Sequence, residues 1–572
     1  MSLTSPIQTI PNDLILFLHS FFCVQQEPDF LALLSTNKTY HKLKPKILFK
    51  RSVRYRKKIE KVSYYDKLVV EFDVTNRNVK KIPFGVTFLA FRENVNVTFT
   101  PGYIPTSVTG MLMPKKIYPP LKPGDIPNSL TDLRLSSSVE YELKPGVIPN
   151  SVTNFDLGFV YNKPLNPGDI PNSVVYLDLG QQFNQPLKHG SIPNSVKILH
   201  MGIAFDQPLM PGDIPSSVTE LHLGTNFNQP LKPGDIPNSV TILHFGRYFN
   251  QPLKPGDIPN SVTALYFYGQ FNQPLNPGDI PDSVTFVRFC DTFFDQPLIP
   301  GSIPNSVTFL DLGRKFNQVL NPGDIPDSVK LLGLSSHYNK ELMSGSIPNS
   351  VTTLIFGMDF NQPLKPGDIP NSVTSVNFNY NFNQPLKPGV IPDSVTDLNL
   401  GIQFNQPLDI GDIPNSVTTL TLSYQFNHPL KPGVIPDSVT TLRFGEEFDQ
   451  HLKPGDIPNS VSVLYLGSRY NDELKPGIIP NSVTYLSLGV AFNKQLNPGD
   501  IPNSVRTLYL SHHFNQILRP GDIPNSVTTL CFGKKFSYTI TPDYIPSSVH
   551  NIIVRGTRNV ADSLKPLVTY SG

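Results

Sequence analysis

Residues 214–235 read IPSSVTELHLGTNFNQPLKPGD, and this unit decides the fold because it recurs along most of the chain. Ile-Pro pairs stand 22 residues apart from Ile82 to Ile280 and again from Ile303 to Ile545, with one step of 23 residues between the two series. The first series has ten starts and the second has twelve, which makes 22 repeats. A fixed period of about 20 to 50 residues is typical of a solenoid, in which each turn buries its apolar face against its neighbours.

One segment of the unit has the alternation of a β-strand. Leu221 and Leu223 alternate with Glu220 and His222, so we expect the leucines to face the core and the other two side chains to face outward. Numbered from the isoleucine of the unit, these four residues occupy positions 7 to 10. Each turn therefore adds one short strand to a parallel sheet, and the mostly β stack is expected to reach a length on the order of 100 Å at ~4.8 Å per strand.

The remainder of each turn is expected to be extended rather than helical. Prolines at positions 2, 17 and 20 remove backbone donors and fix φ, which would break an α-helix repeatedly. Pro233-Gly234 suits a type II turn, because glycine supplies the positive φ that its second central position needs. Phe227 is expected to fill the interior of the turn, and Asn228 to bond backbone groups as one rung of a structural ladder.

Composition excludes several classes of protein. The net charge of +2 does not point to a nucleic acid or a membrane surface. Cys23, Cys290 and Cys531 form no CxxC pair, and they fit a reducing compartment better than a disulfide framework or a zinc site. No apolar run reaches the ~18 residues of a bilayer span, and no secretory signal pattern opens the chain. We therefore expect a soluble, cytoplasmic protein with no membrane partner.

The repeat resembles two known repeat families. Residues 218–226 fit the LxxLxLxxN core of leucine-rich repeats, although most other turns carry the asparagine two residues later. The Phe-Asn and Ile-Pro pairs, here at 227–228 and 236–237, resemble FNIP repeats more specifically, and this resemblance covers residues 82–554. It implies a leucine-rich-repeat-like solenoid with one parallel strand per turn. It also implies a source among social amoebae or the giant viruses that infect amoebae, and then a place in the host cytoplasm.

The first 50 residues follow another pattern. Leu14, Phe17, Leu18, Phe21 and Phe22 recur at the spacing of one helix face. Ile-Pro-Asn-Asp-Leu at 10–14 stands where F-boxes have Leu-Pro-x-Glu-Leu, so this segment resembles an F-box, although the chain has no tryptophan for the later part of that signature. F-boxes are small helical modules that dock on the Skp-type linker of cullin-RING ubiquitin ligases. The linker contacts that the resemblance implies are Pro11, Leu14, Leu18 and Phe22.

Four regions follow from these patterns. They are an F-box-like helical module at 8–50, a basic linker with a capping strand at 51–81, the solenoid of 22 FNIP repeats at 82–554 and a C-terminal cap at 555–572. The alternative for the first region is a plain helical cap of the solenoid. The basic stretch within 42–61 is interpreted as a solvated helix face, with contact to RNA or an acidic partner as the alternative.

Positions 7 and 9 face outward and vary sharply from turn to turn. Charged, histidine and aromatic side chains stand there beside apolar ones, and tyrosine and arginine are common anchors of protein interfaces. We therefore predict a target-binding strip in the central turns, with an ordinary solvated sheet face as the alternative. The strip comprises Asp178, Ile198, His200, Glu220, His222, Ile242, His244, Tyr266, Phe286, Arg288 and Phe309.

Three histidines of the strip need separate consideration. His200, His222 and His244 occupy position 9 of successive turns, about 5 Å apart across adjacent strands, which is within reach of a shared metal. The chain has no known metal-binding motif, and a flat ladder gives poor tetrahedral geometry, so the sequence favours a recognition surface. Nor does it contain a nucleophile elbow, a P-loop or a dinucleotide fingerprint, so we expect no enzyme activity and no cofactor.

The leading hypothesis from the sequence is a substrate-recruiting adaptor. The F-box would bind a Skp-type linker and its cullin complex, the solenoid would bind an unknown target, and the local concentration of target near the ligase would rise. The second hypothesis is a scaffold or decoy that binds a protein partner without ubiquitylation. An RNA-binding scaffold acting through residues 42–61 is the third, and the low net charge disfavours it.

Overall fold

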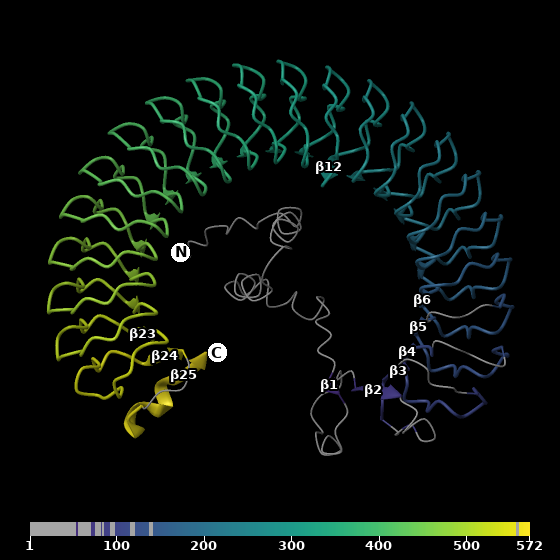
Figure 1. The fold of residues 1–572 in the computed structure, drawn as a ribbon, viewed down its shortest axis with the longest axis horizontal. Coiled ribbons are helices and arrows are strands. Elements are labelled where there is room, and N and C mark those ends of the chain that lie inside the picture. The colour runs from purple at the N-terminus through teal and green to yellow at the C-terminus, as the bar shows by residue number, and fades with distance from the viewer. Residues whose placement is uncertain are drawn as a thin grey trace, which may run out of the picture.

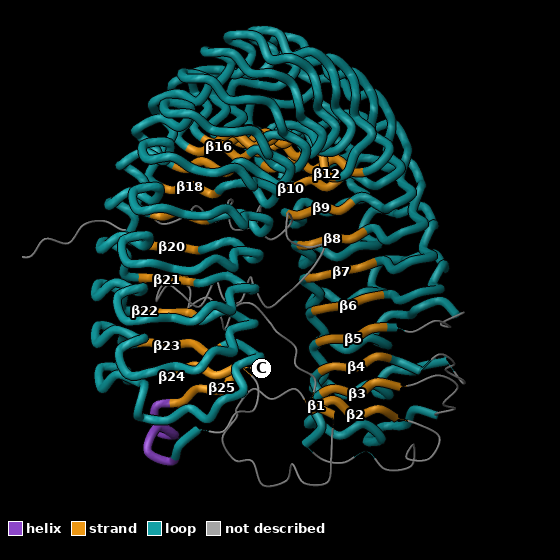
Figure 2. Tube along the Cα trace, turned by 60° about the vertical axis from the view of Figure 1, so that its left-hand side comes forward, coloured by secondary structure: helices purple, strands orange, loops and turns teal. Residues whose placement is uncertain are grey.

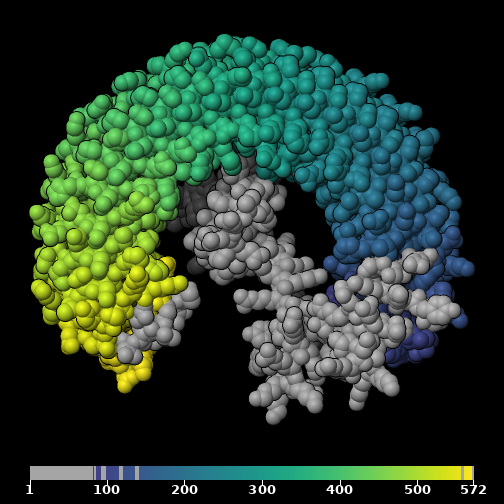
Figure 3. Space-filling model, in the orientation of Figure 1, coloured from purple at the N-terminus to yellow at the C-terminus, as the bar shows by residue number. Residues whose placement is uncertain are grey.

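The protein forms an open arc of stacked turns (Figures 1 and 2). The computed structural model describes residues 53–54, 70–74, 82, 85–91, 98–114, 120–135, 141–555 and 560–571. Within these residues, twenty-five strands form one parallel sheet that lines the inner side of the arc. The return segments of the turns form the outer side, and in Figure 3 their side chains close into a continuous rim. The F-box-like segment 8–50, with its four predicted linker contacts, lies outside the described residues.

The strands follow one another in chain order. They are β1 (Val53–Arg54), β2 (Val70–Val74), β3 (Phe88–Phe91), β4 (Gly110–Leu112), β5 (Asp132–Arg134), β6 (Asn154–Asp156), β7 (Tyr176–Asp178), β8 (Ile198–His200), β9 (Glu220–His222), β10 (Ile242–His244), β11 (Ala264–Tyr268), β12 (Phe286–Cys290), β13 (Phe309–Asp311), β14 (Leu331–Gly333), β15 (Thr353–Ile355), β16 (Ser375–Asn377), β17 (Asp397–Asn399), β18 (Thr419–Thr421), β19 (Thr441–Arg443), β20 (Val463–Tyr465), β21 (Tyr485–Ser487), β22 (Thr507–Tyr509), β23 (Thr529–Phe532), β24 (Asn551–Arg555) and β25 (Val568–Ser571). A 3-10 helix, η2 (Asp562–Leu567), precedes β25. Strands β3 to β24 correspond one to one to the 22 repeats.

Each strand pairs in parallel with the strand of the next turn at the same repeat positions. Ile242 pairs with Glu220, and His244 pairs with His222. The leucine at position 8 is buried in β9 and in β10, whereas the residues at positions 7 and 9 are half-buried. The predicted alternation is confirmed, and this register sets equal repeat positions side by side along the whole arc.

The Lys-Pro-Gly-Asp segment forms the type II turn that the sequence predicts. The N–H of Asp235 donates to the carbonyl of Lys232 at 3.1 Å, and Gly234 has a φ of 93°. The Asp235 carboxylate accepts the N–H of Lys232 at 2.8 Å, which closes the bend from its other side. Among the described repeats, the segments between strands contain no α-helix, as the proline positions require.

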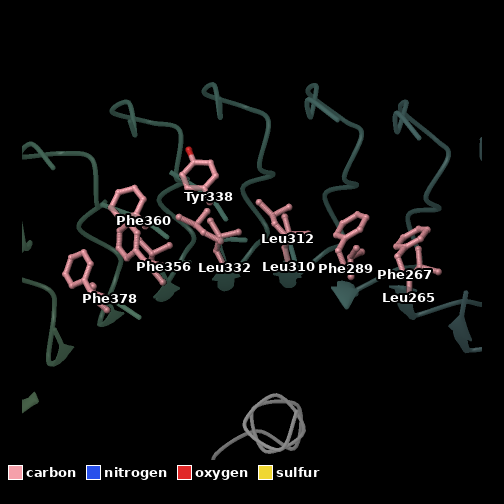
Figure 4. Packing of buried hydrophobic residues seen from close by; sticks show 14 of the residues in the cluster. Leu265, Phe267, Phe289, Leu310, Leu312, Leu332, Tyr338, Phe356, Phe360 and Phe378 are labelled. Atoms are coloured by element: carbon pink, nitrogen blue, oxygen red, sulfur yellow. The ribbon is translucent and has the colours of Figure 1, made fainter. Parts of the chain in front are cut away.

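Position 14 forms a column of aromatic rings through the interior. Phe205, Phe227 and Phe249 are fully buried. Their neighbouring rings stack with centroids 6.2 Å apart. Figure 4 shows two members of the column, Tyr338 and Phe360, on the outer side of the strand leucines. These rings and the strand leucines make one core that runs the length of the arc.

Position 15 forms the structural ladder that the sequence predicts. Oδ1 of Asn184 accepts the backbone N–H of Asp206 at 2.9 Å, and Oδ1 of Asp206 accepts the N–H of Asn228 at 2.8 Å. The same bond joins later turns as far as Ser537, whose N–H donates to Asn515. A carboxylate at this position therefore keeps the acceptor role of the asparagine, and the ladder supplies a partner to a backbone donor that packing would otherwise leave unpaired.

Unequal column spacings explain the curvature. Ring centroids at position 14 are 6.0 to 6.4 Å apart, whereas neighbouring parallel strands lie ~4.8 Å apart. On the inner face, the rings of His222 and His244 are only 3.9 Å apart. Each turn is therefore a wedge, wide outside and narrow inside, and successive wedges bend the sheet. The flat ladder expected from the sequence is wrong, because strand spacing alone says nothing about the width of the outer column.

The ends and the irregular step follow the same architecture. Strand β25 pairs with β24 at the last edge, and β2 and β1 extend the sheet beyond β3. The extra residue of the 23-residue step lies in the loop after β12, where Asp291 has a φ of 49°. Phe294 still stacks in the aromatic column of position 14. Among the described residues, no helix has the length and apolar character that a membrane crossing requires.

Candidate functional site on the concave face

The concave face of the arc carries the side chains of positions 7 and 9. All eleven residues of the predicted strip lie on strands β7 to β13, and the parallel register places them in two neighbouring columns on this face. The sequence therefore gives their relative placement correctly.

Seven rings form a continuous line across β7 to β13, here called the ring column. The His200 and His222 centroids are 3.9 Å apart, and the His244 and Tyr266 centroids are 4.2 Å apart. The line begins with a tyrosine that the strip did not include and ends with two phenylalanines 4.2 Å apart. Its members are Tyr176, His200, His222, His244, Tyr266, Phe286 and Phe309. Such a row presents ring faces and edges to any molecule in the hollow of the arc.

Carboxylates accompany the histidines. Nε2 of His222 lies 2.7 Å from Oε1 of Glu220, and Nδ1 of His200 lies 4.0 Å from Oδ2 of Asp178. The hydrogen bond from His222 holds the pKa of the Glu220 carboxyl below its usual value, so Glu220 is ionised near neutral pH. The first part of the strip is therefore acidic as well as aromatic.

His244 is the most enclosed histidine of the three. Its Nδ1 lies 3.1 Å from the hydroxyl of Tyr268, which fixes the orientation of the ring. Burial, together with the smaller effect of the neighbouring His222, lowers the pKa of His244 to about 3. The His244 imidazole is therefore neutral at pH 7, with Nδ1 engaged by the tyrosine.

Arg288 does not stand as an open anchor. Its Nε lies 3.1 Å from Oδ2 of Asp311, and both side chains are largely buried. The other carboxylate oxygen of Asp311 accepts the N–H of Gly313 at 2.9 Å. Burial raises the pKa of the Asp311 carboxyl, and Arg288 opposes that shift. The pair is thus a fixed part of the concave wall, which the sequence did not foresee.

Two aspartates at position 9 also have a structural role. Oδ1 of Asp178 accepts the N–H of Gly180 at 2.8 Å, and Asp156 bonds Gly158 in the same way at 2.7 Å. Gly180 has a φ of 78°, and a Cβ on it would lie 2.0 Å from the carbonyl oxygen of Gly158. Glycine is therefore required at position 11 of this turn, where the chain leaves the strand, and the aspartates hold that exit.

A cavity of about 640 Å³ opens beside the ring column, where the chain leaves strands β6 to β12. The three strip histidines line it together with position-11 glycines. Tyr268, Cys290 and Asp291 line it at the far end, and the sequence reasoning did not include them. A signal was present, because Tyr268 and Cys290 replace the glycine of position 11 in the two turns beside the 23-residue step.

An apolar cluster adjoins the ring column on β12 to β15. Phe309 and Ile355 are buried, and Phe286 and Leu331 pack partly buried against them. Phe309 is only 6% exposed, so it packs against its neighbours and presents little surface to a partner. The concave face thus changes along the arc from acidic and histidine-rich on β7 to β10 to apolar on β12 to β15.

The FNIP repeat family matches consecutive and overlapping segments of the chain that together cover well over half of it. These segments are 119–159, 161–203, 205–248, 249–292, 271–315, 294–335, 316–359, 360–402, 404–447, 448–490, 470–513, 492–519 and 514–554. The chain belongs to the FNIP repeat family. The family is defined by a structural repeat, and the match indicates no catalytic family. No curated protein matches this FNIP repeat chain.

One solved structure places the FNIP arc among leucine-rich-repeat folds. The arc is similar to CroV588, described as a novel circular LRR protein structure, with 28% identity, a TM-score of 0.65, and coverage of 88% of this chain and 81% of the other. TLR13 in complex with ssRNA13 shows 14% identity and a TM-score of 0.49 over 82% of this chain and 74% of the other. YopM from Yersinia enterocolitica WA-314 shows 15% identity and a TM-score of 0.36 over 85% and 91%.

Proposed function

We propose that the chain is a protein-binding scaffold whose concave strip on β7 to β13 holds a target protein. One observation carries the proposal, namely the ring column, which sets seven aromatic or imidazole rings side by side on one face. Aromatic side chains are enriched in the cores of protein interfaces, and rigid rings lose little conformational entropy on binding.

The two ends of the strip differ in charge and polarity. Glu220 and Asp178 add negative charge at one end, and Phe286 and Leu331 add apolar surface at the other. A target segment with basic residues followed by apolar ones would match both ends. Charge complementarity of this kind sets register and the rate of association more than affinity.

Capture of partners from a cell lysate tests this proposal. Tyr266→Ala combined with Phe286→Ser is expected to lose the specific partners that the parent chain retains. The matched control is Ile410→Asp, because Ile410 is 69% exposed and stands in the bend of its turn, where most other turns have the proline of Pro-Gly, away from the strands. Partners that bind the parent and the concave-face variant equally would contradict the proposal.

The finer form of the proposal is an adaptor of a cullin-RING ubiquitin ligase that works in the cytoplasm. Its support is the F-box resemblance of residues 8–50, which assigns contact with a Skp-type linker to Pro11, Leu14, Leu18 and Phe22. In this form the chain transfers nothing itself and acts by holding the target near the ligase. The alternative is a scaffold or decoy that binds the same target without ubiquitylation.

A double substitution separates these two forms. Leu14→Asp with Leu18→Asp is expected to abolish binding of a purified Skp-type linker while leaving capture of targets by the solenoid intact. Failure of the parent chain to bind any Skp-type linker, with targets still captured, would leave the scaffold or decoy form. The concave-face variant reports on the target and the helix variant on the ligase, so each part can fail separately.

A further inference from the structure

Glu220, His222 and His244 bring three metal-ligating groups together on the concave face. One ligand atom from each lies within 4.8 Å of the other two, and all three residues are half-buried. Glu220 and His222 stand at positions 7 and 9 of β9, on the same face of the strand, and His244 faces His222 on β10. Within the described residues, no other group of three His, Cys, Asp or Glu side chains meets this spacing.

We propose that Glu220, His222 and His244 bind a divalent transition-metal ion of the zinc type. Two imidazoles and one carboxylate form a ligand set that zinc accepts, with a fourth position left for water or another ligand. This trio differs from the three histidines considered in the sequence, because Glu220 takes the place of His200. This site goes beyond target binding and does not depend on it.

The three ligand atoms must shift to reach the arrangement that a zinc ion requires. Zinc ligands at about 2.0 to 2.1 Å in a tetrahedron lie roughly 3.3 Å from one another, so the more distant atoms need to approach by at most about 1.5 Å, whereas the His222 and Glu220 atoms need to separate by about 0.6 Å. Nε2 of His222 and Oε1 of Glu220 are already 2.7 Å apart, and an ion would replace the proton that they share. The His222 and His244 rings lie nearly parallel, at 8°, so their lone pairs point alongside one another. Both rings must turn to direct those lone pairs at one ion, and His244 must do so while it keeps its contact with Tyr268.

A further contact resembles the outer support of metal-bound histidines. The Tyr268 hydroxyl engages Nδ1 of His244 at 3.1 Å, which leaves Nε2 of that ring for the ion. Hydrogen bonds of this kind fix ring orientation, and their loss typically costs 10- to 100-fold in metal affinity. The fourth position would face the 640 Å³ cavity that His222 and His244 line, so water can reach it.

Zinc binding to the full chain is the test, measured by calorimetry after removal of metals with a chelator. We expect one zinc ion per chain, with at least a 100-fold loss of affinity in the His222→Gln, His244→Gln double variant. Tyr268→Phe is expected to weaken binding about tenfold through loss of the outer contact. The same samples with cobalt should show the visible absorption of a tetrahedral site only in proteins that retain the trio.

His451→Gln is the matched control. His451 pairs with Asp472 in the structure but has no third ligand beside it within the described residues, so this variant should bind zinc as the parent does. Equal zinc affinity in the parent and the double variant, or no binding at zinc concentrations up to about 1 mM, would overturn the proposal. Glu220→Gln, which keeps the shape of the side chain, gives an independent readout if the double variant does not fold. Since no partner is added, this result is distinct from the test of target binding.

Discussion

Strands β7 to β13 and strands β16 to β19 share a backbone and a core but present different concave faces. Phe227 and Phe404 are fully buried at the same position of their turns, and Asn228 and Asn383 each accept a backbone N–H from the next turn. Where the first region carries rings, the second carries one large side chain, Arg443, and otherwise small polar ones, namely Ser375, Asn377, Asp397, Asn399, Thr419, Thr421 and Thr441. The interior positions therefore specify the fold, while positions 7 and 9 are free to specify a surface.

Substitution of the core phenylalanine should have the largest effect, and the same effect in both regions. Phe227→Ala and Phe404→Ala each remove a buried ring, at an expected cost of about 3 to 5 kcal/mol. The loss should be local, because each turn contacts only its neighbours. Hydrogen exchange measured by mass spectrometry gives the free energy of local opening in each region. A much smaller cost in one region than in the other would break the claim of a shared core.

Loss of the ladder asparagine should come next. Asn228→Ala leaves the N–H of Asn250 without its acceptor, and Asn383→Ala does the same to Asn405, each at about 0.5 to 1.5 kcal/mol, because water can reach both bonds. Asn228→Asp should change the opening free energy little, because Asp206 already fills this role one turn earlier. Hydrogen exchange of the recipient amide is the readout. Equal destabilisation by alanine and by aspartate would show that the acceptor is not what matters.

The core and the surface were not equally predictable from sequence. The period, the strand at positions 7 to 10, the type II turn and the asparagine ladder all follow from residues that recur in almost every turn. Curvature does not, because it depends on the difference between ring spacing at position 14 and strand spacing, and no single turn contains that difference. The Arg288–Asp311 pair and the Tyr268–His244 contact join residues of different turns, so the repeat pattern does not reveal them.

A position-9 substitution should separate the two concave faces. Tyr266→Ala is expected to weaken target binding at least tenfold, or about 1.4 kcal/mol, whereas Thr421→Ala at the same repeat position should leave it unchanged. The captured target, once purified, allows a direct measurement by calorimetry. An equal loss from both substitutions would remove the distinction between the two faces.

Neutralising the turn aspartate should give the smallest effect, and one that depends on pH. Burial raises the pKa of Asp235 and of Asp412 above the ordinary 3.8, so the protonated form is favoured in the folded state. That contribution to stability is present below the ordinary pKa and is lost as pH rises through the raised one. Asp235→Asn keeps a carbonyl acceptor for Lys232, and so should be slightly more stable than the parent at pH 7.

The stability difference between Asp235→Asn and the parent should depend on pH, and so should that of Asp412→Asn. The advantage of Asp235→Asn should shrink as pH falls towards 3.8, and Asp412→Asn in the second region should behave alike. Local opening free energies at several pH values between 7 and 3.5 provide the measurement. An advantage that grows as pH falls would have the wrong sign and would contradict the assignment of burial as the cause.

Side-chain footprinting of the chain with its captured target tests the central claim most directly. Hydroxyl radicals label exposed tyrosine, histidine and phenylalanine rings, so the method compares the ring column with tyrosines further along the arc, on β20 and β22, in one experiment. We predict that target binding protects His222, Tyr266 and Phe286 while leaving Tyr465 of β20 and Tyr509 of β22 labelled as in the free chain. Protection of Tyr465 and Tyr509 with unchanged labelling of the ring column would show that the target binds elsewhere on the arc.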